Sequence, residues 1–181
     1  VYHGRFTDLP VSLCLEQLRL WDRPPVSESP ARVWIELGFA TCALRTGDHH
    51  HARARLSQSR LGPPKDSAAR LEQRLLEAFL ASKDSDHARA ITLLSEVPAL
   101  LDAPDLPEDD RACFRARWLD QAAFQALHPP PPSQPDLARA RSLYERIAVA
   151  SGPPFALAKR EGGLAYVCHR LGDAESARVH A

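Results

Sequence analysis

The sequence lacks several features that would assign it to a functional class. Its 181 residues include no Met and no Asn, and 23 basic side chains balance 23 acidic ones. A net charge of zero, without an acidic or basic tail, gives no argument for nucleic acid or a membrane surface as a partner. No apolar run approaches the length of about 18 residues that crosses a bilayer, so we expect no membrane-spanning helix.

Motifs of catalysis and metal binding are also missing. No G-x-S-x-G, glycine-rich phosphate loop, H-E-x-x-H or Cys–His signature occurs. The three consecutive histidines at 49–51 cannot converge on one ion, because successive helical residues point about 100° apart. We therefore expect no enzymatic activity, no cofactor and no metal ion.

The four cysteines, Cys14, Cys42, Cys113 and Cys168, are widely spaced and include no C-x-x-C pair. Each lies in an apolar helical context, which favours buried, reduced thiols, although an even number of cysteines permits disulfides. Reduced thiols predict an intracellular protein, cytoplasmic or nuclear. Because the chain begins without Met and stops just after a new helix begins, we expect it to be a segment of a longer protein.

Prolines divide the chain into helical segments. Of the 16 prolines, 13 cluster at 24–25, 63–64, 104–107, 129–135 and 153–154, and helices end near such residues because Pro has no N–H donor. Between the clusters, apolar residues recur every three or four positions, which predicts helices throughout. The expected helices cover roughly 8–21, 30–46, 49–61, 67–81, 88–101, 108–127, 137–150 and 155–171, with another beginning after Asp173.

An internal repeat is the most informative feature of the chain. Residues 36–53 and 161–178 share eight of 18 positions, including a Gly-Asp step, and shorter similar blocks begin at His51, His87, Leu137 and Ser176. A repeat of this kind predicts one structural unit that is stacked several times. Each unit would be a helical hairpin of about 34–40 residues.

The repeated residues resemble a known family. In the first unit, Trp34, Leu37 and Gly38 precede the Gly-Asp turn, and Ala52 and Leu56 follow it. This order of large and small residues is similar to that of tetratricopeptide-repeat proteins, and the similarity covers residues 30–181. Small residues at such positions let paired helices approach closely. The first helices of the first and fourth units are about two residues longer than the family's, and the small residue early in each second helix is Ala52 or Ala54, Ala88 or Ala90, and Ala138 or Ala140.

The resemblance implies an all-α fold. We expect a right-handed superhelical array of about four antiparallel helical hairpins, a divergent tetratricopeptide-like solenoid. An N-terminal helix within residues 1–29 would pack on this array, and the hairpins would occupy 30–64, 65–103, 107–152 and 154–181.

The resemblance also implies a function in protein–protein interaction. We expect a scaffold or adaptor segment that binds a peptide or partner helix in a concave groove, with arginines available for acidic motifs. Chaperone-binding members of the family use a clamp that includes Asn, which this chain lacks. The alternative is an oligomerisation or regulatory segment that stacks on another chain through its repeat ends. Projecting the family's groove positions gives Arg32, Ile35, Phe39, Cys42, Arg115, Leu119, Arg160 and Leu164 as candidate groove residues. For Phe39 and Leu164, a place in the core between repeats is the alternative.

Overall fold

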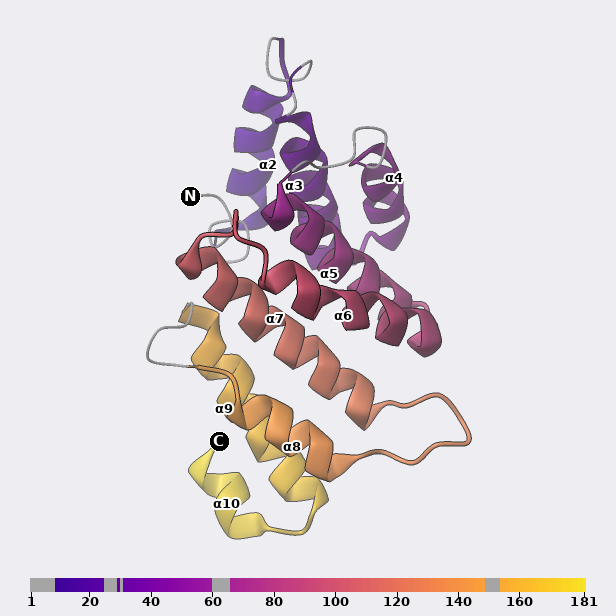
Figure 1. Ribbon diagram of the computed structural model, residues 1–181, viewed down its shortest axis with the longest axis vertical. Coiled ribbons are helices and arrows are strands. Elements are labelled where there is room, and N and C mark those ends of the chain that lie inside the picture. Colours follow the sequence, from indigo (N-terminus) through magenta and orange to yellow (C-terminus); the bar gives the residue numbers. More distant parts are fainter. Residues whose placement is uncertain (1–8, 25–28, 30, 60–65, 149–153) are drawn as a thin grey trace.

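The computed structural model describes the chain except for residues 1–8, 25–28, 30, 60–65 and 149–153. The described residues form nine α-helices and no strand, which confirms the all-α prediction. The helices follow one another along the long axis of the molecule in chain order (Figure 1). They are α2 (Val11–Trp21), α3 (Arg32–Arg45), α4 (His49–Ser59), α5 (Ser67–Lys83), α6 (His87–Leu101), α7 (Glu108–Leu127), α8 (Leu137–Glu145), α9 (Pro154–Arg170) and α10 (Ala174–Val179).

The helices pack in consecutive pairs. Helix α3 packs on α4, α5 on α6, α7 on α8 and α9 on α10. The first helices of the pairs also contact each other in chain order, α3 with α5, α5 with α7 and α7 with α9. Helix α2 packs against α3, where its buried Cys14 and Leu18 meet Ile35, Phe39 and Cys42.

Two hydrogen bonds of one aspartate recur where each pair is joined, in three short turns and in the longer link of residues 128–136 between α7 and α8. The backbone N–H of this aspartate donates to a carbonyl in the last turn of the first helix, at 2.8–3.0 Å. The carboxylate of the same aspartate accepts the N–H three residues later, at 2.9–3.1 Å, and so caps the second helix. The four aspartates are Asp48, Asp86, Asp136 and Asp173.

Two of these turns are the Gly-Asp steps of the sequence repeat. Gly47 and Gly172 both have φ +79, a left-handed conformation that lacks a steric cost only in glycine. Ser85 takes the corresponding position before Asp86, at φ 61. The expectation that Gly47 ends its helix in the left-handed region is therefore confirmed.

The position of each capping aspartate also determines which alanine of the second helix is buried within the pair. Ala52, Ala90 and Ala140 lie four residues after the capping aspartates and are completely buried. In the second and third units the buried alanine is thus the later of the two candidates. One turn further on, Leu56, Leu94 and Tyr144 are also buried, and each joins a core shared with the neighbouring first helices.

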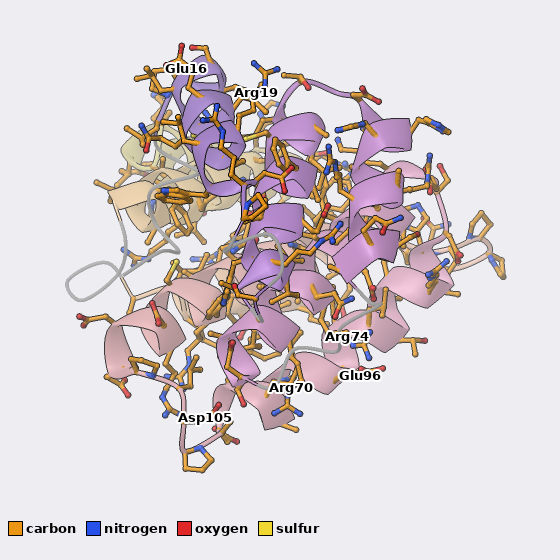
Figure 2. All side chains as sticks on the ribbon, turned by 90° about the horizontal axis from the view of Figure 1, so that it is seen from above. Glu16, Arg19, Arg70, Arg74, Glu96 and Asp105 are labelled. Carbon is orange, nitrogen blue, oxygen red and sulfur yellow. The ribbon has the colours of Figure 1, made fainter. Side chains whose placement is uncertain are left out.

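Polar contacts outside the hairpin turns fix the start of α5. Asp66 caps this helix by accepting the Ala69 N–H at 2.6 Å. Asp105, from the link between α6 and α7, accepts the Ser67 N–H at 2.9 Å and the Ser67 hydroxyl at 2.7 Å. Asp105 lies at the rim of the molecule, on the same side as Arg70 (Figure 2). The backbone and side-chain hydrogen bonds from Ser67 lower the pKa of the Asp105 carboxyl.

The lowered pKa of Asp105 predicts a pH-dependent stability. A carboxyl whose folded-state pKa lies below its ordinary value of 3.8 stabilises the protein above that value. This stabilisation is lost as the pH falls through the folded-state pKa. We expect the difference in the free energy of unfolding between the wild type and Asp105→Ala to be largest at neutral pH and to shrink below pH 3.8. Urea denaturation across pH 2–7 measures this difference, and a difference that is constant over the range would contradict the assignment.

Two adjacent glycines of α9 predict opposite changes in stability. A Cβ added at Gly162 would have no neighbour within 4 Å, whereas one at Gly163 would lie 2.4 Å from the Tyr144 ring. Gly162→Ala should raise the free energy of unfolding by about 0.5–1 kcal/mol, because alanine favours the helix. Gly163→Ala should lower it by about 1–3 kcal/mol, since the buried ring must move. Equal shifts of the urea midpoint in the two variants would contradict this packing.

Candidate functional site

The first helices of successive pairs line a mostly apolar hollow, which we call the central hollow. Its volume is about 360 Å³. Four helices contribute to it, one from each helical pair of the chain. The lining residues are Thr41, Leu44 and Arg45 of α3, Leu76 and Phe79 of α5, Arg117, Asp120 and Gln121 of α7, and Phe155 and Lys159 of α9.

A second hollow, which we call the distal hollow, lies between α7 and α9 and has a volume of about 440 Å³. Aromatic rings line it, with Phe124 and Tyr166 exposed at 39% and 42% and Tyr144 buried. Its remaining lining residues are Asp120, Leu127, His128, Ala158, Lys159, Gly162 and Gly163.

One ion pair belongs to both hollows. The Lys159 Nζ lies 3.0 Å from the Asp120 Oδ2 and joins α9 to α7, and both residues line the central and the distal hollow. The two hollows are therefore adjacent parts of one surface, which we call the first-helix face. We take this face as the candidate functional site.

The floor of the distal hollow is rigid and carries a hydroxyl donor. The Tyr144 ring packs directly on the backbone of α9, because Gly163 has no side chain to keep it away. Burial, together with the neighbouring Asp120 and Tyr166, raises the pKa of Tyr144 to about 12. At neutral pH this hydroxyl is therefore protonated and can donate a hydrogen bond.

A buried ion pair supports the wall of the central hollow. Both terminal nitrogens of the Arg117 guanidinium contact the Glu72 carboxylate of α5, with 3.0 Å between Nη2 and Oε1. The two side chains are only 14% and 9% exposed. This two-point geometry joins α5 to α7 beneath the hollow and fixes the direction of the arginine.

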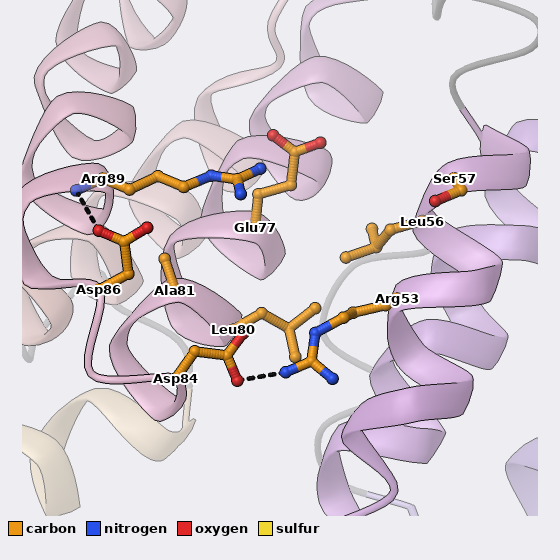
Figure 3. Close-up of a pocket in the computed structure, with 9 residues that line it drawn as sticks. All are labelled: Arg53, Leu56, Ser57, Glu77, Leu80, Ala81, Asp84, Asp86 and Arg89. Atoms are coloured by element: carbon orange, nitrogen blue, oxygen red, sulfur yellow. Dashed lines mark hydrogen bonds and ion pairs between the residues drawn. The ribbon is translucent and has the colours of Figure 1, made fainter.

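A third, polar hollow of about 200 Å³ lies between α4, the end of α5 and the start of α6 (Figure 3). Its charged side chains make contacts within the protein. Arg53 pairs with Asp84, Asp86 caps α6, and Arg89 points toward Glu77 (Figure 3). Glu77 also pairs with Arg74 at 3.0 Å, and Arg74 pairs with Glu96 at 2.8 Å across to α6 (Figure 2). We therefore assign this hollow a role in joining the repeats.

None of the groove residues predicted from the sequence lines the central or the distal hollow. The apolar candidates are covered by other helices. Ile35, Phe39 and Cys42 pack under α2, and Leu119 and Leu164 belong to the core around α7, α8 and α9. For Leu164, the core between repeats is therefore the observed position, whereas Phe39 packs in a core between α3 and the N-terminal helix α2.

The charged candidates keep some exposure. The Arg32 Nε lies 3.6 Å from the Glu36 carboxylate, and the Arg160 Nη1 lies 3.1 Å from Glu161. Arg115 is exposed on α7. Contact of these residues with a partner remains a prediction.

The difference between the predicted and the observed lining has a geometric cause. Thr41, Arg117 and Gln121 line the central hollow, and each lies two residues after a predicted position. A shift of two residues turns a helix by about 200° and moves a side chain to the other side. The resemblance left the phase of the helices open, whereas in the structure the hydrogen bonds of the capping aspartates fix the register at the end of each first helix.

A recurring pair of residues on the first helices was not predicted. The reference point is the residue whose carbonyl accepts the N–H of the capping aspartate. In three of these helices, an aromatic residue lies two positions before it and a basic residue lies two positions after it. The pairs are Phe79 with Lys83, Phe124 with His128, and Tyr166 with Arg170. The sequence holds this signal, but the unequal spacing of the repeats hides it until the turns supply the alignment.

Two histidines make hydrogen bonds within the protein. The His51 Nε2 accepts a hydrogen bond from the Arg55 Nε at 3.3 Å, and the His87 Nδ1 lies 3.0 Å from the Gln125 Oε1. Among the described residues, no group of three His, Cys, Asp or Glu side chains is arranged to hold a metal ion. In the same part of the chain, no helix is long and apolar enough to cross a membrane.

Comparisons with known proteins do not place the chain in a family. No family model, no curated protein and no solved structure matches it.

The Arg117–Glu72 pair predicts a strong effect of single substitutions. Arg117→Met should lower the free energy of unfolding by about 3–5 kcal/mol, because it leaves the buried Glu72 carboxylate without its arginine. The double variant Glu72→Leu/Arg117→Met should recover most of this loss, since no charge then remains buried. Urea denaturation measures both values. A double variant as unstable as Arg117→Met would show that packing, and not the unpaired charge, dominates.

Proposed function

We propose that this chain is a protein-interaction scaffold, a divergent tetratricopeptide-like array that binds a peptide segment of another protein on the first-helix face. Its helical pairs would follow one another with a constant, right-handed rotation, and the first helices would form the inner wall. The chain would act as an adaptor segment of a larger intracellular protein.

One observation carries the proposal. Four first helices, separated widely in sequence, contribute side chains to two adjacent hollows, and these hollows combine exposed aromatic rings with a few polar groups. Peptide-binding grooves use this combination, in which apolar pockets supply affinity and polar groups set orientation. The hairpin turns and ion pairs fix the walls independently of any ligand, which favours binding with little rearrangement.

A second candidate function rests on a different surface. Leu13 and Leu20 of α2 are 48% and 54% exposed, and Val179 of α10 is 78% exposed. Apolar side chains on the outermost helices of an array favour stacking on another chain. Self-association through these helices is therefore the alternative, and light scattering at micromolar concentration distinguishes it from a peptide-binding monomer.

The proposed function is tested by blocking the distal hollow. Random 12-residue peptides displayed on phage are selected against the purified chain, and the affinity of the enriched peptides is measured by fluorescence anisotropy. Gly162→Trp places a large side chain at the open wall of the hollow and should weaken binding at least tenfold.

Gly162→Ala is the matched control, because it changes the same position without filling the hollow, and it should leave the affinity within twofold of the wild type. The proposal fails if no peptide is enriched, or if the enriched peptides bind the wild type and Gly162→Trp equally.

A further inference from the structure

The three aromatic–basic pairs of the first helices occupy equivalent places, and we call them rungs. In the α5 rung the Lys83 Nζ lies 5.2 Å from the centre of the Phe79 ring. In the α7 rung the Phe124 and His128 rings stack with their centres 4.2 Å apart. Each basic side chain thus lies over the ring that precedes it by one helical turn.

The α9 rung completes the series. The guanidinium carbon of Arg170 lies 5.8 Å from the centre of the Tyr166 ring, and its Nη1 donates to the Tyr166 hydroxyl at 2.8 Å. Because this hydroxyl accepts the bond from Arg170, its own proton is available to a ligand.

The rungs flank the hollows of the first-helix face. Phe79 lines the central hollow, and Phe124, His128 and Tyr166 line the distal hollow. Since α5 contacts α7 and α7 contacts α9, successive rungs are separated by about one helix spacing of 8–10 Å.

The basic side chains of the rungs are not used to join helices. By contrast, Arg117 pairs with Glu72 and Lys159 pairs with Asp120 between the first helices. Lys83, His128 and Arg170 are exposed and make no ion pair within the described residues. The face therefore offers three basic groups that the fold itself does not neutralise.

From this pattern we infer that the first-helix face binds an extended acidic segment of a partner protein. One carboxylate of the segment meets each rung, and apolar side chains enter the hollows between the rungs. The inference rests on the proposed function and adds the chemistry and the periodicity of the ligand. Carboxylates satisfy the basic groups, while aliphatic or proline side chains cover the exposed aromatic rings.

The spacing of the rungs sets the spacing of the carboxylates. An extended polyproline II segment rises about 3.1 Å per residue, so three residues span about 9 Å, which matches the distance between successive helices. A carboxylate at every third residue can therefore meet successive rungs. A carboxylate at every fourth residue advances about 12 Å and loses register within two rungs.

A protein ligand fits this face better than a nucleic acid. Asp120 lines both hollows and already pairs with Lys159, so the hollows themselves offer no unpaired positive charge to a continuous chain of phosphates. The net charge of the chain is zero, whereas nucleic-acid affinity depends on many positive contacts. A segment with separate carboxylates can place an apolar side chain next to Asp120.

The inference is tested with three fluorescein-labelled 12-residue peptides and a single-stranded DNA. The first peptide, (Glu-Leu-Pro)4, has the expected spacing. The second, (Gln-Leu-Pro)4, lacks the charge, and the third, (Glu-Leu-Pro-Pro)3, has the wrong period. A 12-nucleotide oligo(dT) represents a polyanion with stackable bases. Affinities are measured by anisotropy with the wild type and with the triple variant Lys83→Glu/His128→Glu/Arg170→Glu.

We expect the first peptide to bind at least tenfold more tightly than the second and several-fold more tightly than the third, because two exposed ion pairs, from Lys83 and Arg170, and a hydrogen bond from His128 together give about one order of magnitude. The triple variant should bind the first peptide at least tenfold more weakly. The control variant Arg19→Glu/Arg139→Glu/Arg178→Glu reverses three exposed charges outside the face and should stay within twofold of the wild type.

The possible results separate the inference from the proposed function. Equal binding of the Glu and Gln peptides, or an unchanged affinity in the triple variant, overturns the inference that the ligand is acidic. Tighter binding of oligo(dT) that the triple variant abolishes also overturns it, in favour of a nucleic-acid ligand. If the peptides selected by phage display still respond to Gly162→Trp in any of these cases, the peptide-binding function stands without its acidic specificity.

Discussion

The paired hydrogen bonds of the capping aspartates set the geometry on which the rest of this structure depends. In each hairpin the aspartate N–H ties the second helix to the end of the first, while its carboxylate satisfies an N–H of the next helical turn. In the first three pairs this fixes the relative rotation of the two helices, so that the buried alanine four residues later faces the first helix. Close approach of the helices follows, because alanine occupies little space at the contact.

The contacts between pairs have a different chemical character. Apolar clusters are shared by neighbouring pairs, and ion pairs such as Arg117–Glu72, Lys159–Asp120 and Arg53–Asp84 connect helices that belong to different pairs. Charged groups that would be costly to bury alone are thereby neutralised where repeats meet. The first-helix face carries one such ion pair, Lys159–Asp120, and beside it three rungs, each an aromatic ring followed by an exposed basic side chain that makes no ion pair in the described structure. These three basic groups are the physical basis for the ligand that we propose.

The sequence-based groove residues illustrate the limit of projecting a pattern onto a helix. The repeat alignment of 36–53 with 161–178 placed Gly47 with Gly172 and Asp48 with Asp173, and both pairs have the same conformation in the structure. The same analysis placed Phe39 and Leu119 on a groove, whereas both are buried in the structure, and Thr41 and Gln121 line the central hollow. Local signals therefore located the turns, but the phase of the first helices depends on contacts with other helices.

The sequence by itself determined the helical class, the positions of the breaks and the equivalence of the Gly-Asp turns, because proline, glycine and capping aspartate act through the backbone of their own segment. Only the tertiary structure decided which face of each first helix is open. That choice depends on where α2 covers α3 and on how successive pairs rotate, and both result from contacts between residues far apart in the chain. It also aligned the three rungs, whose unequal spacing in the sequence comes from links of different length between helices.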